Sequence, residues 1–212
     1  MEISWLGHAS FRIINSNNSI IYIDPYNIPK DEIKKADIII LTHGHYDHFD
    51  IPSIKNLRKE TTIVLGPKGI SSNLKKIGGK VLEFGDIYEH EGVKIELMPG
   101  YTANKSSHPK NAGGAGVIVE TDNKVVYHAG DSDRIPEMKN LVSKNVNVAL
   151  LPCGGKFTMD MDMASDCALD IKPKIVVPMH NWNNDLNVFK NLMNKKDPSI
   201  QVEILENKQL II

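Results

Sequence analysis

The sequence predicts an α+β fold in which two mixed β-sheets pack together and helices cover their outer faces. The 212 residues suit one domain, since a domain usually has roughly 100 to 200 residues. Hydrophobic residues make up 41% and charged residues 24%, which is typical of a globular protein without long disorder. Short strands come first, then helices alternate with strands, and no repeat or composition break marks a boundary. A single core spanning residues 1–212 is the simplest arrangement.

Apolar runs and turn residues place the elements of the first half. Turn-forming residues separate short runs rich in Ile and Val, which predicts successive strands. A helix is expected after Asp50, which can cap a first turn containing Pro52, and another over residues 67–77, which Gly78 and Gly79 can end. We expect strands at residues 3–6, 11–14, 20–24, 37–42, 61–65, 80–84 and 93–98.

The second half begins with the least regular stretch of the chain. Residues 99–114 are rich in Gly, Pro, Ser and Asn, and we interpret them as a functional loop. A hairpin over residues 116–128 follows and turns at Asp122 and Asn123. We then expect helices near residues 136–143, 161–171 and 186–195, and strands at residues 148–152, 175–179 and 202–206.

Charge and cysteine content exclude several classes of protein. The formal net charge of −1 gives no general attraction to nucleic acid. Cys153 and Cys167 are too few for a disulfide framework and too far apart for a Cys-x-x-Cys site. The first residues show no basic and then apolar leader, and no apolar run approaches a length of about 18 residues. We therefore expect a cytoplasmic protein without a membrane or nucleic-acid partner.

Residues 41–50, LTHGHYDHFD, carry the strongest functional signal. His43 and His45 lie two positions apart, so on an extended segment their side chains point to one side and can share a metal ion. Asp47 and His48 follow at the expected start of a helix and can supply an oxygen and a nitrogen to a second ion. Imidazole and carboxylate ligands favour Zn²⁺ and also suit Mn²⁺ or Fe²⁺.

The alternative is that these histidines are ordinary polar residues beside a strand. That interpretation fits any one of them taken singly. It fits the group poorly, because desolvating several crowded imidazoles lowers stability unless something compensates. Two four-ligand sites also need further residues, which the later chain offers at strand ends or in the functional loop: His108, Asp131 and His180.

The whole pattern, Thr-His-x-His-x-Asp-His with a later His, a Gly-Asp after a strand and a final His, resembles the metallo-β-lactamase-fold hydrolases. Within them it looks most like small proteins related to ascorbate-6-phosphate lactonase. The resemblance extends over the segments WLGHASFRI, IYIDP, LTHGHYDH, YHAGDSD, LPCGGKFTMD and IKPKIVVPMH. It implies a four-layer αβ/βα sandwich with both metal ions held at one edge of the sheets.

The resemblance also implies a ligand set. His43, His45 and His108 would hold the first ion, and Asp47, His48 and His180 the second, with Asp131 as the bridge. His108 lies further from the preceding strand than the third ligand of many relatives, so the loop has to bring it back. His90 is the competing residue, although its surroundings, YEHEGVKI, indicate a solvated turn.

Other residues are expected near the ions. Relatives have an acidic residue at the position of Asp24, which we expect to support the ligand histidines, although a plain strand-end aspartate before Pro25 is the alternative. The resemblance places His8 and His128 near the metals, where either could orient the bridging aspartate or protonate a leaving group. A satisfied core histidine is the alternative for both.

Three residues are candidates for substrate binding: Tyr101, Lys105 and Lys156. Lys156 departs from the family pattern, in which a small hydroxyl residue is common at this position. A cation there suits an anionic substrate, and a solvated lysine is the alternative.

The leading hypothesis for function is hydrolysis of a small molecule by a hydroxide held between two divalent ions, zinc first, with Asp47, Asp131, His8 and His128 as catalytic residues. The bond is an ester, lactone, amide or phosphodiester. A di-iron redox or dioxygen-handling protein is an alternative, and so is a nuclease of the same superfamily. Relatives form various assemblies, so a homo-oligomer stays open.

Overall fold

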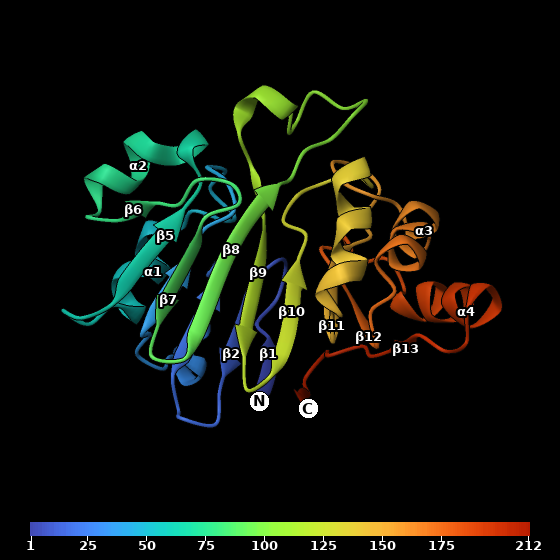
Figure 1. Ribbon diagram of the computed structural model, residues 1–212, viewed down its shortest axis with the longest axis horizontal. Helices are drawn as coiled ribbons and strands as arrows, with labels where there is room; N and C mark the ends of the chain where they lie inside the picture. Colours follow the sequence, from blue (N-terminus) through green and yellow to red (C-terminus); the bar gives the residue numbers. More distant parts are fainter.

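The computed structural model describes residues 1–212 and contains two seven-stranded β-sheets, as predicted (Figure 1). The first sheet has the order β14 (Gln209–Ile211), β1 (Glu2–Trp5), β2 (Phe11–Ile14), β3 (Ile20–Ile23), β4 (Ile38–Ile40), β5 (Ile63–Gly66) and β6 (Lys80–Val81). The second has the order β13 (Gln201–Val202), β12 (Ile175–Met179), β11 (Val148–Pro152), β10 (Lys124–His128), β9 (Ala115–Thr121), β8 (Val93–Pro99) and β7 (Ile87–His90). Both sheets are mixed.

Helices flank both sheets. The α-helices are α1 (Ile51–Leu57), α2 (Ser71–Lys76), α3 (Met161–Ile171) and α4 (Leu186–Lys196). The 3₁₀ helices are η1 (Lys30–Glu32), η2 (Lys68–Ile70), η3 (Lys110–Ala112) and η4 (Pro136–Lys144). In Figure 1, α1 and α2 lie on one side of the molecule and α3 and α4 on the other. None of the helices has the length and apolar character needed to span a bilayer.

Three hydrophobic clusters fill the spaces between the layers. The first lies between the two sheets and joins residues such as Ile21 to Val119. The second packs the second sheet against η4, α3 and α4, and the third packs the first sheet against α1 and α2. Three clusters between successive layers define a four-layer αβ/βα sandwich, which confirms the predicted fold class.

The strand β4 shows why such a sandwich needs continuous apolar strands. Ile38 and Ile40 belong to the cluster between the sheets, and Ile39 points to the opposite face, toward α1. Since successive side chains of a strand alternate between faces, a strand covered on both sides has to be apolar throughout. The run of three isoleucines before the histidine-rich segment therefore marks a doubly covered strand.

The structure corrects four of the predicted elements. The segment YEHEGVKI, expected to be a solvated turn, instead begins within strand β7, which pairs with β8. The expected helix at 67–77 is split into η2 and α2, and the expected strands at 80–84 and 202–206 reduce to β6 and β13. The last strand is instead β14, which pairs with β1 along the edge of the first sheet.

The sandwich brings strand ends from both sheets to one edge. Strands β3, β4 and β5 are parallel, and so are β10, β11 and β12. The loop over residues 100–114 projects from the end to which β8 and β10 point, and both chain termini lie at the opposite end (Figure 1). Ligands of open α/β sheets bind at the carboxyl ends of parallel strands. We therefore expect the functional site at this edge of the sheets.

We expect Ile39→Ala to lower the free energy of unfolding by roughly 2 to 5 kcal/mol, because it leaves a cavity at a fully buried position. Urea denaturation followed by circular dichroism measures the change. The matched control is Ile87→Ala on β7, where the side chain is 58% exposed and the loss should be no more than about 1 kcal/mol. Equal losses in the two variants would contradict the layer assignment.

Candidate metal centre

Two groups of side chains with metal-ligand chemistry meet at this edge. One comprises His43, His45 and His108, and the other His8, Asp47, His48 and His180, and within each group the ligand atoms lie within 4.8 Å of one another. Their positions follow from the fold, because the residues come from the loops after β1, β4, β8 and β12. The loop over residues 100–114 does bring His108 back to the site, as the sequence analysis required.

The first group has the spacing of ligands around a common ion. His43 Nε2 lies 3.1 Å from His45 Nδ1, and His108 Nε2 lies 3.0 Å from the same atom. Nitrogen ligands about 2.0 to 2.1 Å from a tetrahedral zinc ion are themselves roughly 3.3 Å apart. His43 and His108 are buried, whereas His45 is exposed and leaves the group open on one side.

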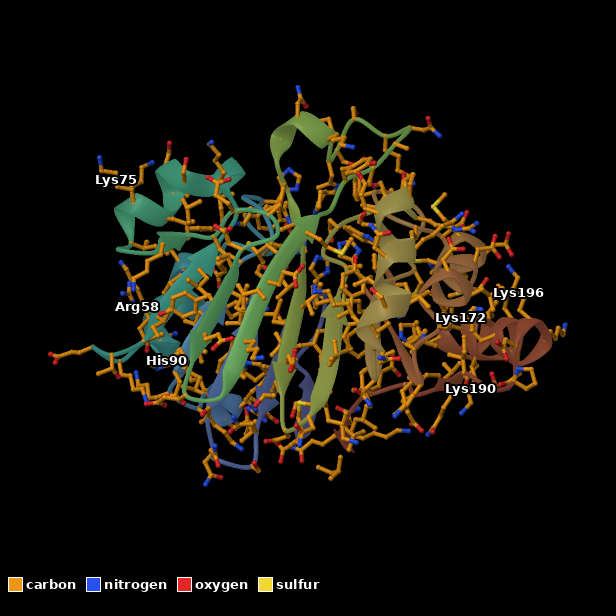
Figure 2. The ribbon with its side chains drawn as sticks, viewed as in Figure 1. Arg58, Lys75, His90, Lys172, Lys190 and Lys196 are labelled. Carbon is orange, nitrogen blue, oxygen red and sulfur yellow. The ribbon has the colours of Figure 1, made fainter.

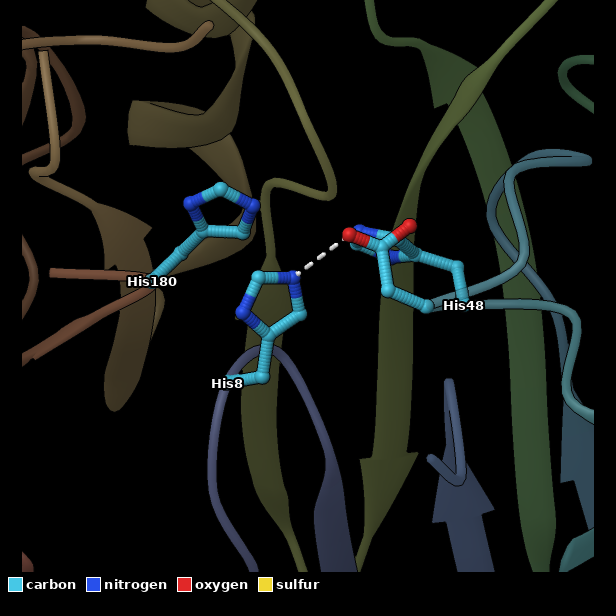
Figure 3. A group of neighbouring side chains, drawn as sticks. His8, His48 and His180 are labelled. Carbon is cyan, nitrogen blue, oxygen red and sulfur yellow. Dashed lines mark hydrogen bonds and ion pairs between the residues drawn. The ribbon is translucent and has the colours of Figure 1, made fainter. Parts of the chain in front are cut away.

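The second group assembles from three separate loops. His8, His48 and His180 converge from the loops after β1, β4 and β12 (Figure 3). His8 Nε2 lies 3.1 Å from Asp47 Oδ2, and the His8 ring packs on the His180 ring with a centroid separation of 4.0 Å. His8 is therefore in place both to orient Asp47 and to reach the open side of this group.

Asp131 lies between the two groups. Its Oδ2 is 3.3 Å from His108 Nε2 and 3.2 Å from His180 Nε2, and its Oδ1 is 3.3 Å from His48 Nε2. The side chain follows β10, so the second sheet carries it toward histidines of the first. Asp131 thus faces both groups closely, which is the position that a bridging ligand requires.

Buried polar atoms without partners show that the centre fits metal ions. Seven buried side-chain nitrogen and oxygen atoms in the chain lack a hydrogen bond, and three of them are His48 Nε2, Asp131 Oδ1 and His180 Nδ1. Leaving such a group unsatisfied costs about 1 to 3 kcal/mol, and nearly all buried polar groups in proteins have partners. Lone pairs of a carboxylate and an imidazole that face each other without bonding suit a cation placed between them.

One carboxylate orients histidines of both groups. Asp24 Oδ2 accepts a hydrogen bond from His48 Nδ1 at 2.6 Å and another from the Thr42 hydroxyl at 2.6 Å. Because Thr42 gives its only hydroxyl hydrogen to Asp24, it accepts from His43 Nδ1, which lies 3.0 Å away. The Nε2 atoms of His43 and His48 are thereby left as lone pairs that face the centre.

His108 is oriented in the same way by the backbone. Its Nδ1 lies 3.3 Å from the carbonyl oxygen of Phe157, which can only accept, so this nitrogen carries the proton and Nε2 is free. The expected supporting role of Asp24 thus has a geometric basis. The role of Thr42 was missed, although the residue stands at the start of the motif.

Burial and charge set the protonation of the centre. Burial and the neighbouring His48 hold the pKa of His43 well below its usual value, and burial also lowers the pKa of His108. Burial raises the pKa of Asp131, but His48 and His180 outweigh it and hold that pKa well below its usual value. Neutral imidazoles beside an ionised carboxylate are the protonation states that metal binding requires.

His48 behaves differently because it faces two carboxylates. Burial lowers its pKa, but Asp131 and Asp24 outweigh burial and hold the pKa well above its usual value. The two carboxylates therefore favour a positive charge between them, which neutralises part of their own charge. A bound cation would take over that neutralising role.

Backbone strain is also concentrated at the centre. His8, Asp24, His180 and Trp182 have φ angles of 52°, 46°, 49° and 49°, in the left-handed region that residues other than glycine seldom adopt. Such conformations cost of order 1 to 3 kcal/mol each and collect at functional sites. At Asp24, the Ser10 hydroxyl donates to the carbonyl oxygen and accepts from the backbone N–H of Tyr26, which fixes the turn.

The structure places His128 in the core. Its Nε2 lies 2.8 Å from the carbonyl oxygen of Ala9, and its Nδ1 accepts a hydrogen bond from the backbone N–H of Gly130 at 3.0 Å. Both ring nitrogens are engaged and the side chain is fully buried, so the geometry favours the satisfied core histidine over the expected catalytic role. Through Gly130, His128 instead fixes the turn that carries Asp131.

The expected substrate residues are dispersed. The Tyr101 hydroxyl donates to Glu137, and Lys105 Nζ donates to the buried Asp133 at 2.5 Å, so neither lines the cavity beside the histidines. Lys156 lies on the other side of the centre, above the rings of Phe157 and Trp182. His90 ends β7 and is labelled far from the loop edge in Figure 2, so it does not compete with His108.

A cavity of about 250 Å³ opens beside the first group of histidines. Its other walls come from η2, α2 and the loop over residues 100–114, and they include Gly69, Ser72, Asn73 and Gly114. A side chain at Gly69 would collide with the backbone at Ala112, so glycine is needed where these segments meet. No sequence motif predicts this wall, because residues far apart in the chain form it.

Comparison with known proteins agrees with this chemistry. The family described as "Beta-lactamase superfamily domain" matches residues 2–180. A UPF0173 metal-dependent hydrolase from Methanobrevibacter smithii is 31% identical, over 97% of this chain and 94% of the relative. Another, from Nanoarchaeum equitans, is 35% identical over 85% of this chain and 83% of the relative. The finer resemblance to proteins related to ascorbate-6-phosphate lactonase stays a prediction.

Solved structures share the fold. A protein from Parabacteroides distasonis, assigned as a metal-dependent hydrolase, has a TM-score of 0.85 and 33% identity, covering 95% of this chain and 91% of that chain. CmlA, a diiron β-hydroxylase from Streptomyces venezuelae, has a TM-score of 0.80 at 15% identity and covers 100% of this chain but 54% of its own. At that identity, the likeness to CmlA shows the fold alone.

We expect Asp24→Asn to weaken metal binding by about 10- to 100-fold, because an amide has one acceptor oxygen and cannot accept from His48 and from both the hydroxyl and the backbone N–H of Thr42, as the carboxylate does. Competition with a chromogenic chelator measures the affinity. The control is Asp37→Asn, whose carboxylate contacts Lys59 and the backbone of Ile20, and which should bind metal like the unaltered protein. Unchanged affinity in the Asp24 variant would rule out its orienting role.

Proposed function

The chain belongs to the metallo-β-lactamase superfamily, and on that premise we propose that it is a dinuclear hydrolase of a small-molecule ester, lactone, amide or phosphodiester. The curated relatives that match nearly the whole chain are named metal-dependent hydrolases. The position of Asp131 between two groups of ligand atoms supports the use of two ions. Ligands of nitrogen and oxygen favour zinc, with manganese or iron as alternatives.

The residues present divide into two ligand sets and a bridge. His43, His45 and His108 would hold one ion, and Asp47, His48 and His180 the other, with Asp131 shared. When bound, a pair of divalent ions lowers the pKa of water from 15.7 to about 7, polarises the substrate oxygen and stabilises the leaving oxygen. No serine or cysteine nucleophile is required.

The protein's own groups supply position and proton transfer. Asp24 and Thr42 hold His48 and His43 in one tautomer, so their free nitrogens stay aimed at the centre. His8 contacts Asp47 through Nε2 and keeps 22% of its side chain exposed, whereas the surrounding ligands are mostly buried. This position at the open side supports a role for His8 in passing a proton to the leaving group.

We expect close to two zinc or manganese ions per chain in protein purified without chelators, measured by elemental mass spectrometry, since two clusters of ligand atoms flank Asp131. Iron together with visible absorbance that bleaches on reduction would favour the di-iron alternative, whose fold CmlA shares. A chain that holds no metal and cannot be reloaded would contradict the proposal.

We expect Asp131→Ala to reduce hydrolysis by at least about 100-fold and to lower metal occupancy by one ion per chain, because the bridge supports charge stabilisation worth several kcal/mol. Turnover is measured on a panel of chromogenic esters, lactones, amides and phosphodiesters, and occupancy by elemental mass spectrometry. The control is Asp86→Ala in the exposed turn before β7, which should match the unaltered protein in both. Full activity of the Asp131 variant would exclude the bridging role.

A further inference from the structure

We propose that an aromatic surface beside the second ligand group binds a planar aromatic ring that carries a negative charge. This surface, the aromatic arc, consists of Tyr46, Tyr26, Trp182, Phe157 and Lys156. The inference rests on the proposed function, because it names the class of substrate that would be hydrolysed. It goes beyond that function, since neither the metal ligands nor the fold require aromatic residues here.

The arc is continuous through His8. The Tyr26 ring lies 6.0 Å from the Tyr46 ring and 5.9 Å from the His8 ring, between centroids. On the other side of His8, the Trp182 ring lies 6.1 Å away. Phe157 continues the surface, with its ring 5.6 Å from Trp182. These separations are within the range of about 4.5 to 7 Å for interacting aromatic pairs.

The arc borders the ligands directly. Tyr46 stands between His45 and Asp47 in the chain, and Trp182 lies 5.7 Å from the His180 ring. A substrate whose scissile bond lies at the metal centre would therefore place its neighbouring atoms against these rings. The cavity by His43 is lined by none of the arc residues and has mostly small side chains in its walls, so it suits the smaller part of such a substrate.

The two principal rings of the arc are exposed. Tyr46 is 74% and Trp182 47% exposed, which is unusual for large aromatic side chains of a single chain and indicates a binding surface when they gather beside a site. The indole N–H of Trp182 donates to no protein acceptor, whereas that of Trp5 donates to the carbonyl oxygen of His8. The arc thus presents an unused donor as well as ring faces.

The exposed position of Trp182 is built into the backbone. Its φ angle of 49° is left-handed, and a side chain at Gly154 would collide with the indole ring. The protein therefore holds the indole in place through a strained residue and an obligatory glycine. This arrangement separates Trp182 from an incidental surface tryptophan.

The positive charge of Lys156 favours an anionic group at one end of the arc. Lys156 Nζ lies 4.9 Å from the Phe157 centroid and 5.7 Å from the Trp182 centroid, and it has no carboxylate partner. Lys105 and Lys110, by contrast, pair with Asp133 and Glu137. The ammonium of Lys156 is available to an anionic group on a ring stacked against Trp182. A cation in this position is attracted both to the aromatic face and to the anionic group.

The test is calorimetric titration of the metal-loaded protein with three probes: 2-naphthoate, cyclohexanecarboxylate and 2-naphthalenemethanol. The first two share a carboxylate, so any affinity of that group for the ions cancels in their comparison. We expect 2-naphthoate to bind at least about 10-fold more tightly than cyclohexanecarboxylate, as stacking on one aromatic side chain predicts. Equal affinities would overturn the proposal.

Variants assign the preference to the arc. Trp182→Ala should abolish the 10-fold difference and Trp182→Phe should retain part of it, while elemental mass spectrometry checks that both keep their metal. Lys156→Ala should reduce the preference for 2-naphthoate over the neutral alcohol by about 2- to 5-fold. A difference that survives in Trp182→Ala would overturn the assignment to the indole.

Tyr88→Leu is the matched control, because Tyr88 also lies beneath a lysine, with Lys80 Nζ 5.7 Å from its ring, but stands on β7 away from the metal centre. It should leave all three affinities unchanged, and an equal loss there would overturn the proposal.

The experiment distinguishes a failure of the aromatic arc from a failure of the proposed hydrolase. If the protein holds metal but does not prefer 2-naphthoate, only the proposed aromatic arc is overturned. If the protein cannot hold metal but still binds the aromatic ring through Trp182, only the proposed hydrolase function is overturned.

Discussion

The buried carboxylate of Asp24 is the constraint on which the metal centre depends. It follows β3, lies fully buried, and accepts hydrogen bonds from His48 and from both the hydroxyl and the backbone N–H of Thr42. Through Thr42 it also fixes His43. A carboxylate without such partners would be strongly destabilising at this depth, so its environment and the orientation of the histidines require each other. The ring orientations of His43 and His48 are therefore set by residues of the first sheet and its loops.

The second sheet supplies the candidate ligands that the first sheet lacks. Asp131 and His180 follow β10 and β12, and His128 holds the Gly130 turn so that Asp131 points across the interface between the sheets. The apolar cluster between the sheets fixes the distance between the two halves. Hydrophobic packing therefore determines whether the two groups of ligand atoms can meet. This is why continuous apolar strands and a polar edge occur together in one chain.

Much of the fold could be predicted from the sequence, because strands covered on both faces leave unbroken apolar runs, such as Ile38 to Ile40. The strand β7 was missed because it lies at a sheet edge, where half-exposed residues such as Tyr88 and His90 resemble a turn. The clustering of the histidines and aspartates was predictable, because few roles other than metal binding explain these residue types in such spacing. The roles of Thr42 and His128 were not, since a hydroxyl or an imidazole acquires its function from neighbours that only the fold brings together.

The same reasoning separates what binds metal from what selects a substrate. Ligand chemistry is restricted to a few residue types, so it leaves a pattern in the sequence around His43 and His180. A ring-binding surface can be built from any aromatic residues that the loops bring together, and Tyr26, Tyr46 and Trp182 come from three separate loops. Trp182 also follows two positions after His180, the proposed ligand, and both residues have left-handed φ angles. One short turn therefore sets the directions of the His180 imidazole and of the Trp182 indole, so the proposed metal binding and the proposed ring binding depend on the same backbone geometry.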